Sequence, residues 1–186
     1  MTNYTYYTDG AATMINKNGK YLRKEGGWAY ICLKNNEIIE IQSGGCPLTT
    51  NNEMELYAIY ASFKNFSEIC ESNDNIEVCS DSGYSIDIFT KWITNWQKNG
   101  WRKSDGKTIK NSNLIKAIWN LMSEIENKDC GISFKKVKGH SKNKLNQQAD
   151  ELAVNAKKQA KISQKTTGYN NEPDKLLGNK KLVLNK

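Results

Sequence analysis

The first fifty residues alternate between apolar and polar side chains in a way that predicts β-strands. Residues 3–9 (NYTYYTD) have a period of two, with Tyr4 and Tyr6 on one face. Two further strand-like segments follow, 27–33 (GWAYICL) and 37–44 (EIIEIQSG). Because three turn-forming residues separate these two segments, we predict an antiparallel meander of three strands.

The period changes to that of a helix at Thr50. Thr50 followed by Glu53 has the spacing of a capping box, and apolar residues continue at helical intervals. Glu55 is the exception, because it lies eight residues before Phe63 and therefore on the same stripe as the apolar side chains. We predict a helix from Thr50 to Phe66 that points one carboxylate inward at its first turn.

The remaining pattern alternates strands and helices. The predicted elements are a strand over 75–81, helices over 82–97 and 113–126, a strand over 131–140 and a helix over 143–160. A strand, a helix and another strand in sequence predict a crossover that sets the later strands parallel to a member of the meander. The fold class is therefore α/β.

Composition limits the classes of protein to which this chain can belong. Its 186 residues allow one domain, predicted over 1–160, and a basic C-terminal tail over 161–186 that we expect to be flexible, with at most a short element near 181–184. No apolar segment approaches the roughly 20 residues that cross a bilayer, and the first residues lack the features of a signal peptide. We expect a cytoplasmic protein with no membrane association.

The cysteines and the histidine exclude several kinds of site. The five cysteines are scattered and form no CxxC pair, which favours reduced, buried thiols. The single histidine, His140, cannot supply a zinc site that needs several imidazoles. It can still act as an acid or a base.

The net charge of +7 is unevenly distributed. Residues 91–116 carry a net +6 and residues 157–186 another +6, which leaves −5 for the rest of the chain. The first zone interleaves aromatic and basic side chains, namely Trp92, Trp96 and Trp101 with Lys91, Lys98, Arg102 and Lys103. This pattern is typical of a surface that follows a nucleic-acid backbone. Two of the tryptophans also fit the buried side of an amphipathic helix, and we expect that packing to present the cations.

Three acidic residues are predicted to meet at one edge of the sheet. Asp9 and Asp81 close the first and fourth strands, and Glu55 points inward from the helix between them. If these strands are neighbours, the carboxylates converge in the crevice beyond the strand ends. Alone, each residue has an ordinary explanation as a turn former, a helix cap or a partner of the helix dipole.

Three converging carboxylates predict a metal site. At about 4 Å they would repel one another by roughly 4 kcal/mol per pair at an effective dielectric near 20. A divalent cation removes this repulsion, and Mg²⁺ is suited to carboxylates, water and substrate phosphate. Two such ions would stabilise both the attacking and the leaving oxygen of a phosphodiester displacement. An acidic site beside basic zones therefore predicts chemistry on nucleic acid.

Five motifs, in this order, resemble those of type 1 ribonuclease H: YTDGAA, TTNNEMELYA, CSDSGY, KWITNWQKNGW and VKGHSKNKLNQQADELA. The resemblance implies a ribonuclease H-like fold, with a five-stranded mixed sheet of three antiparallel and two parallel strands and helices on both faces. It implies an enzyme that hydrolyses the RNA strand of RNA–DNA hybrids and leaves 3′-hydroxyl and 5′-phosphate ends. We also expect a monomer. The implied cofactor is a pair of Mg²⁺ ions, for which Mn²⁺ can substitute.

The resemblance also assigns roles to single residues. Its four metal-binding carboxylates match Asp9, Glu55, Asp81 and Asp150, the last of which periodicity alone would place on an exposed helix face. His140 matches a mobile-loop histidine that helps protons or product to leave.

Substrate contacts are implied at several positions. Thr50 and Asn111 match residues that hold a DNA phosphate, Asn51 and Asn52 match minor-groove and sugar contacts, Tyr84 and Trp92 match the DNA-strand channel, and the basic protrusion over 91–110 adds Trp96, Lys98, Trp101, Arg102 and Lys103. Two features depart from the family. Residues 11–27 form a longer, more basic connection than usual, and Leu48 stands where some members have an arginine that completes the phosphate pocket.

Two alternatives from other classes remain open at this point. One is a non-catalytic hybrid-binding module that has kept the fold but lost the chemistry. The other is a nuclease or strand-transfer enzyme of the same superfold that acts on DNA. The complete set of acids disfavours the first alternative, and the TTNN motif with the basic protrusion disfavours the second.

Overall fold

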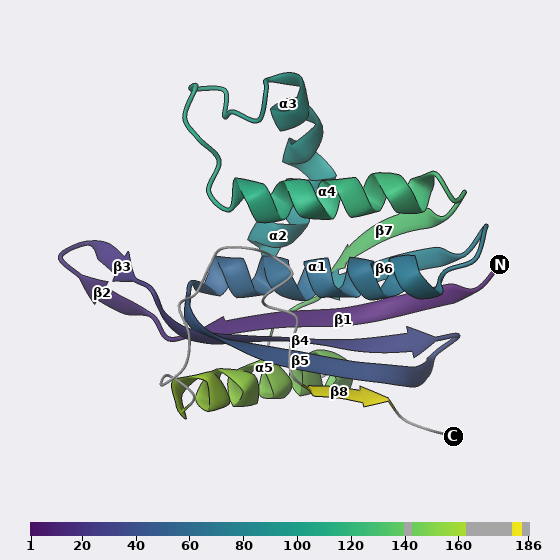
Figure 1. The fold of residues 1–186 in the computed structure, drawn as a ribbon, viewed down its shortest axis with the longest axis horizontal. Coiled ribbons are helices and arrows are strands. Elements are labelled where there is room, and N and C mark those ends of the chain that lie inside the picture. The colour runs from purple at the N-terminus through teal and green to yellow at the C-terminus, as the bar shows by residue number, and fades with distance from the viewer. Residues whose placement is uncertain (140–142, 163–179, 184–186) are drawn as a thin grey trace.

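The computed structural model describes residues 1–139, 143–162 and 180–183. A single mixed sheet forms its centre (Figure 1), with the strand order β7-β6-β1-β4-β5-β8. The first strands along the chain form the predicted meander: β1 (Asn3–Ala12) pairs antiparallel with β4 (Lys24–Lys34), which pairs antiparallel with β5 (Glu37–Thr49). The predicted crossovers are also confirmed, since β6 (Asn75–Ser80) runs parallel to β1, and β7 (Gly131–Lys136) runs parallel to β6.

One strand was not expected as part of this sheet. The chain forms β8 (Lys180–Val183), which pairs antiparallel with β5 and extends the five predicted strands to six. This strand overlaps residues 181–184, where we expected at most a short element. Residues 163–179 and 184–186, which make up most of the predicted tail, lie outside the described residues.

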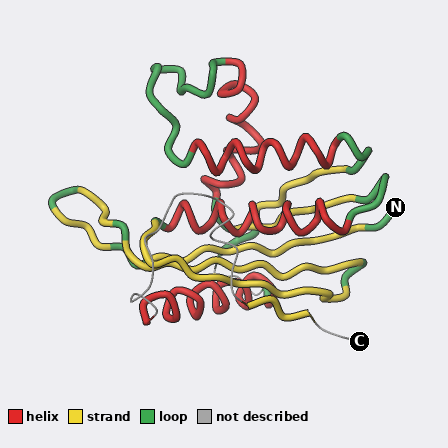
Figure 2. Tube along the Cα trace, in the orientation of Figure 1, coloured by secondary structure: helices red, strands yellow, loops and turns green. Residues whose placement is uncertain are grey.

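Helices cover both faces of the sheet, as predicted (Figure 2). On one face, α1 (Asn51–Ile69) packs on β1 and β4, and α4 (Ser112–Glu126) packs on α1 and β7. On the other face, α5 (Lys144–Ile162) packs on β4, β1 and β5. The side of α1 that faces the core is fully buried at Ile59, Phe63 and Phe66. This burial confirms the helical periodicity predicted for the segment.

The core under α1 is rich in aromatic side chains. Tyr6, Trp28 and Tyr30 project from the sheet and are inaccessible to solvent, and Tyr6 and Tyr30 form an edge-to-face pair at 5.5 Å between ring centroids. Their hydroxyl groups are satisfied, since Tyr6 Oη donates to Asn65 Oδ1 at 2.6 Å and Tyr30 Oη donates to Glu40 Oε1 at 2.6 Å. Such bonds are needed because a buried hydroxyl without a partner is costly.

The predicted helix over 82–97 is confirmed but is not uniform. It consists of α2 (Gly83–Asp87), a π-helical turn η1 (Ile88–Trp92) and α3 (Ile93–Lys98). In Figure 1, α3 and the connection that follows it project away from the sheet, above α4. This projection is the basic protrusion that the sequence predicted.

Two details correct the expectations drawn from the sequence. Residues 11–27 are not a plain loop, because they contain a β-hairpin formed by β2 (Ile15–Lys17) and β3 (Lys20–Leu22). Asp9 lies inside β1 and does not close it. The reason is that β1 loses its parallel partner β6 after Tyr7 but stays paired with β4 as far as Ala12.

The cysteine and membrane expectations can also be compared with the structure. All five cysteines are free thiols, and four of them are buried, as predicted. Among the described residues, no helix is long and apolar enough to cross a membrane.

Candidate active site

A close approach between α1 and β1 sets the position of the first two acids. Gly10 follows Asp9 in β1, and a Cβ atom added at Gly10 would overlap the backbone nitrogen of Glu55 and the carbonyl carbon of Met54. Only glycine allows the start of α1 to lie this close to the strand. The contact therefore brings the first turn of α1, with Glu55, beside Asp9.

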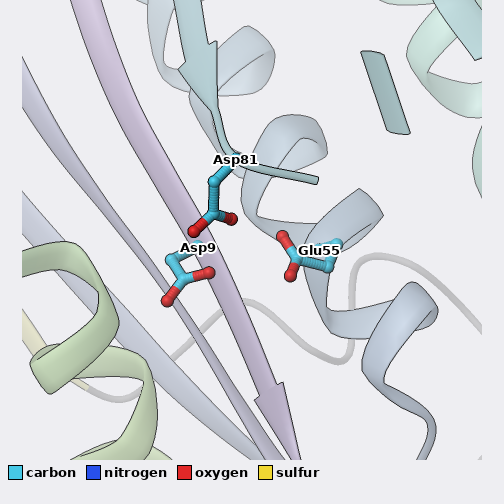
Figure 3. Close-up of side chains that lie close together, drawn as sticks. All are labelled: Asp9, Glu55 and Asp81. Carbon is cyan, nitrogen blue, oxygen red and sulfur yellow. The ribbon is translucent and has the colours of Figure 1, made fainter. Parts of the chain in front are cut away.

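Three carboxylates converge at this point (Figure 3). Asp9 comes from β1, Glu55 from α1, and Asp81 from the residue directly after β6. One oxygen from each lies within 4.8 Å of the others. Asp9 and Glu55 are buried, with exposed fractions of 5% and 6%, and Asp81 is half-buried. The structure thus brings together the three acids that strand ends and helical periodicity predicted.

Asp150 approaches the cluster from the opposite face of the sheet. It lies on α5, which packs so closely on β4 that a Cβ at Gly27 would overlap the backbone of Ala153 and Lys157. Because Asp150 is about one helical turn before Ala153, and α5 also packs on β1, this packing carries Asp150 toward β1. Its charge is among the causes that raise the pKa of the Asp9 carboxyl group.

Burial and mutual repulsion act strongly on the cluster. Burial, followed by the charges of Asp81 and Asp150, raises the pKa of Asp9 to about 8, although the backbone N–H of Gly10 opposes the shift. Burial, followed by the charges of Asp9 and Asp81, raises the pKa of Glu55 well above its ordinary value. Both shifts mean that the ionised cluster needs a positive charge to stabilise it.

The donor set fits a hard divalent cation. Glu55 Oε2 is buried, and among the described residues it has no hydrogen-bond partner. A buried carboxylate oxygen without a partner costs free energy unless a cation or water meets it. Because all the converging groups are carboxylates, Mg²⁺ or Mn²⁺ suits them better than a metal that prefers nitrogen or sulfur.

One residue beside the acids was missed by the sequence analysis. Asn146 is 2% exposed, and its Nδ2 donates to Asp81 Oδ2 at 3.4 Å. Its Oδ1 is buried and has no partner in the part of the chain that the structure describes. Asn146 lies four residues before Asp150, so the helical period that links i and i+4 could have identified it. The predicted role of His140 falls outside the described residues.

A cleft of about 780 Å³ lies next to the acids. Five predicted substrate contacts line it, namely Thr50, Asn51, Asn52, Tyr84 and Asn111. Asn51 connects the cleft to the acids, because its Nδ2 donates to Glu55 Oε1 at 3.4 Å and its Oδ1 accepts from the backbone N–H of Ala12 at 3.1 Å.

Two helices begin at this cleft. Thr50 caps α1, and its Oγ1 accepts from the backbone N–H of Glu53 at 3.3 Å, as the capping box predicted. Asn111 precedes α4 in the left-handed conformation, with φ of 58°. Helix N-termini present unpaired N–H groups and partial positive charge, which favour phosphate.

The remaining predicted contacts lie on the protrusion and do not line this cleft. Trp92 and Trp96 are half-buried and pack on each other at 5.6 Å between ring centroids, so their packing role is confirmed. Trp101 lies under the ammonium of Lys116 at 5.2 Å. The cations Lys98, Arg102 and Lys103 are exposed.

The other side of the cleft was not anticipated. It is lined by Thr13, Met14, Gly19, Leu22 and Arg23, from the hairpin and its two ends, and Lys110 also faces the space. The signal in the sequence was the Asn18-Gly19 dipeptide, a typical hairpin turn, in which both residues have positive φ, 52° and 77°.

The fold and the acid cluster define a class: α/β proteins with a mixed sheet and carboxylates gathered where β1, β6 and α1 meet. Solved structures with this fold include LC9-RNase H1, with a TM-score of 0.66 and 22% identity, covering 85% of this chain and 73% of that one. LC11-RNase H1, solved in complex with an RNA/DNA hybrid, has a TM-score of 0.58 and 16% identity, covering 84% of this chain and 98% of that one.

Sequence comparison identifies the family. The RNase H family model matches residues 1–158. Ribonuclease H of Chlorobium luteolum is 35% identical over 153 residues, which cover 82% of this chain and 93% of that protein. Ribonuclease H of Acetivibrio thermocellus is 36% identical over 155 residues, which cover 83% and 94%. The chain therefore belongs to the RNase H family and is a hydrolytic ribonuclease, which confirms the resemblance to type 1 ribonuclease H.

Proposed function

We propose that this enzyme cleaves the RNA strand of RNA–DNA hybrids endonucleolytically, using two divalent cations held by Asp9, Glu55, Asp81 and Asp150. The observation that carries the proposal is the convergence of three carboxylates within 4.8 Å, with Asp150 interacting with Asp9. The relatives named Ribonuclease H and the similar structure solved with an RNA/DNA hybrid support the choice of substrate.

The protein holds the reacting groups in place. When bound, the cations supply an activated water and stabilise charge on the attacking and leaving oxygens of the scissile phosphate. Glu55 is the residue best placed to face both a cation and the substrate, because it is at the start of α1, beside Asn51. The products would carry 3′-hydroxyl and 5′-phosphate ends, and His140 would assist proton transfer or product release.

The cleft beside the acids supports strand selection. The N-termini of α1 and α4 both open into it, which favours a phosphate between Thr50 and Asn111. Asn51 and Asn52 line the same cleft, and Asn51 also donates to Glu55, so their amide side chains can contact sugars and base edges near the acids. We assign the cleft to the DNA strand and the acids to the RNA strand.

The organisation around this site follows from the same proposal. Residues 1–160 would form the catalytic domain, and the basic segment after it would add nonspecific affinity for nucleic acid. We expect the enzyme to act in the cytoplasm as a monomer. Size-exclusion chromatography with light scattering tests the oligomeric state, and a mass near twice the 21.1 kDa of the chain would contradict it.

The test is cleavage of an end-labelled hybrid with Mg²⁺ or Mn²⁺ by the wild type and by the Asp9→Asn and Asp81→Asn variants. Both variants should lose at least a thousandfold in kcat, because each removes a cation ligand. Glu151→Gln is the matched control, since it removes an exposed carboxylate next to Asp150 and should behave as wild type. Wild-type rates in Asp9→Asn or Asp81→Asn would contradict the proposal.

The same assay separates the two alternatives. A non-catalytic module would bind the hybrid without cleaving it, whereas the proposed enzyme should cleave it and stop when EDTA is added. A DNA-acting enzyme would cleave duplex DNA of the same sequence at least as fast as the hybrid.

A further inference from the structure

The β2–β3 hairpin and its two ends form one wall of the cleft beside the acids. The hairpin extends beyond the end of the sheet, on the same side as the starts of α1 and α4 (Figure 1). It lines the cleft along its length, from Thr13 at one end through Gly19 at the turn to Arg23 at the other. The cleft thus lies between the hairpin and the two helix N-termini.

The composition of this wall is unusual for a solvent-exposed hairpin. Residues 11–24 contain four Lys or Arg residues and no acid. Two large apolar side chains, Met14 and Leu22, line the cleft, yet they are 68% and 40% exposed. Leaving such side chains in water costs free energy. A nucleic-acid strand can cover a surface of this kind, because its phosphates bind the cations and its sugars pack on the apolar side chains.

Arg23 is held at the base of the hairpin, against α1. Its Nη2 donates to Glu53 Oε2 at 2.5 Å and to the carbonyl oxygen of Leu48 at 3.2 Å. Glu53 is fixed in turn, since its Oε2 also accepts from Thr49 Oγ1 at 2.8 Å. A guanidinium carries five N–H donors, and both of these bonds use the same nitrogen. The side chain is 38% exposed and lines the cleft, so further donors are available to a ligand there.

We propose that the β2–β3 hairpin is a second wall of the substrate groove and grips the DNA strand, with Arg23 bound to a DNA phosphate. Lys110 faces the same space and adds to the positive field. Met14 and Leu22 pack against deoxyribose, which has no 2′-hydroxyl group to be left without a hydrogen bond at an apolar surface. The wall therefore selects DNA over RNA in this strand, and this assignment rests on the proposed function.

The experiment measures binding of a fluorescent hybrid by anisotropy, in EDTA, together with kcat and KM for cleavage in Mg²⁺. Arg23→Ala should weaken binding about tenfold, because it removes a charged hydrogen bond. It should also reduce the salt slope of log Kd by about 0.9, the value for one lost phosphate contact. Arg23→Ala should raise KM by a larger factor than it lowers kcat. Arg23→Lys should recover part of the lost affinity.

Two controls separate phosphate binding from a structural role. Lys24→Ala removes an equal charge from the adjacent residue, which does not line the cleft, and should change KM less than twofold. Glu53→Gln weakens the ion pair but keeps the guanidinium, so it should bind the hybrid at least as well as wild type. If Glu53→Gln loses as much affinity as Arg23→Ala, the ion pair serves only to hold α1, and the proposal is wrong.

A chemical change in the substrate tests the strand. Methylphosphonate linkages that remove charge from the DNA strand should weaken binding to the wild type but have little further effect on Arg23→Ala. The assignment is overturned if methylphosphonates in the DNA strand weaken binding to Arg23→Ala as much as they weaken binding to the wild type. It is also overturned if only methylphosphonates in the RNA strand have a smaller effect on Arg23→Ala than on the wild type. A wild type that does not bind the hybrid would instead overturn the proposed function itself, and the inference with it.

Apolar contact is tested separately. The Met14→Ser/Leu22→Ser double variant should narrow the preference for the hybrid over double-stranded RNA, measured as the ratio of their Kd values. An unchanged ratio would contradict the selection of deoxyribose by this wall.

Discussion

Asp9→Asn should stabilise the metal-free protein even though it should abolish cleavage. In the folded state the pKa of Asp9 is raised to about 8 from an ordinary 3.8, first by burial and then by the charges of Asp81 and Asp150. Between these pH values the folded protein holds a proton that the unfolded chain has released. The free energy of unfolding therefore falls as the pH rises through this window, by about 1.4 kcal/mol per pH unit.

The stabilisation expected for Asp9→Asn can be calculated in two ways. Integrating the shift to pH 8 gives a cost of about 5 kcal/mol for ionised Asp9. Coulomb repulsion between two carboxylates at the 4.8 Å limit of the cluster gives about 3.5 kcal/mol per pair at an effective dielectric of 20. An amide of the same shape does not ionise, so Asp9→Asn should recover about 3 to 5 kcal/mol. For a chain of 186 residues this corresponds to a rise in Tm of at least about 6 °C.

The assay is thermal unfolding by circular dichroism in EDTA, from pH 4 to pH 9. The gain in Asp9→Asn should be small near pH 4, where the wild-type carboxyl is protonated in the folded state and only about half ionised in the unfolded chain, and it should level off at its largest value at pH 8 and above. Glu151→Gln, which removes an exposed acid, should show no such trend. With excess Mg²⁺ the wild type should gain stability and the variant should gain less. A destabilised Asp9→Asn at pH 8, or a gain independent of pH, would refute the reasoning.

Three further changes have defined outcomes. Gly10→Ala would force a methyl group into the backbone of α1 at Glu55, so it should cost about 2 kcal/mol or more in urea unfolding and also lower kcat; wild-type kcat would contradict the close approach. Thr50→Ala removes the cap of α1 and should cost about 1 kcal/mol, with weaker hybrid binding in anisotropy; unchanged stability would refute the cap. Removal of residues 163–186, which carry a net +3, should flatten the salt dependence of hybrid binding; an unchanged slope would exclude the tail from binding.

The part of the site that the sequence predicted rests on two periodicities. Period two and the strand ends placed Asp9 and Asp81, and the helical period placed Glu55 on an inward stripe. These signals work because they are local. The position of Asp9 along β1 was wrong in detail, because the length of a strand depends on its partners, and β4 extends β1 beyond the end of β6.

Other parts of the site depend on contacts that no local pattern contains. Asp150 was identified from the family resemblance, and its position depends on the close packing of α5 at Gly27. Asn146 was missed because an asparagine in a polar helix is usually expected at the surface. In the fold it is only 2% exposed. The hairpin was missed because its strands have three residues each, which is too short for a clear alternation.

We propose that the clustered carboxylates hold the divalent cations with which this enzyme cleaves RNA paired to DNA. The most direct measurement is single-turnover cleavage of a hybrid and of the matching duplex DNA by the wild type, as Mg²⁺ is titrated from zero, with the product ends identified by mass spectrometry. We predict cleavage of the RNA strand alone, dependent on Mg²⁺, with 3′-hydroxyl and 5′-phosphate ends. Cleavage that persists in EDTA, or an RNA strand that stays intact at saturating Mg²⁺, would contradict the account.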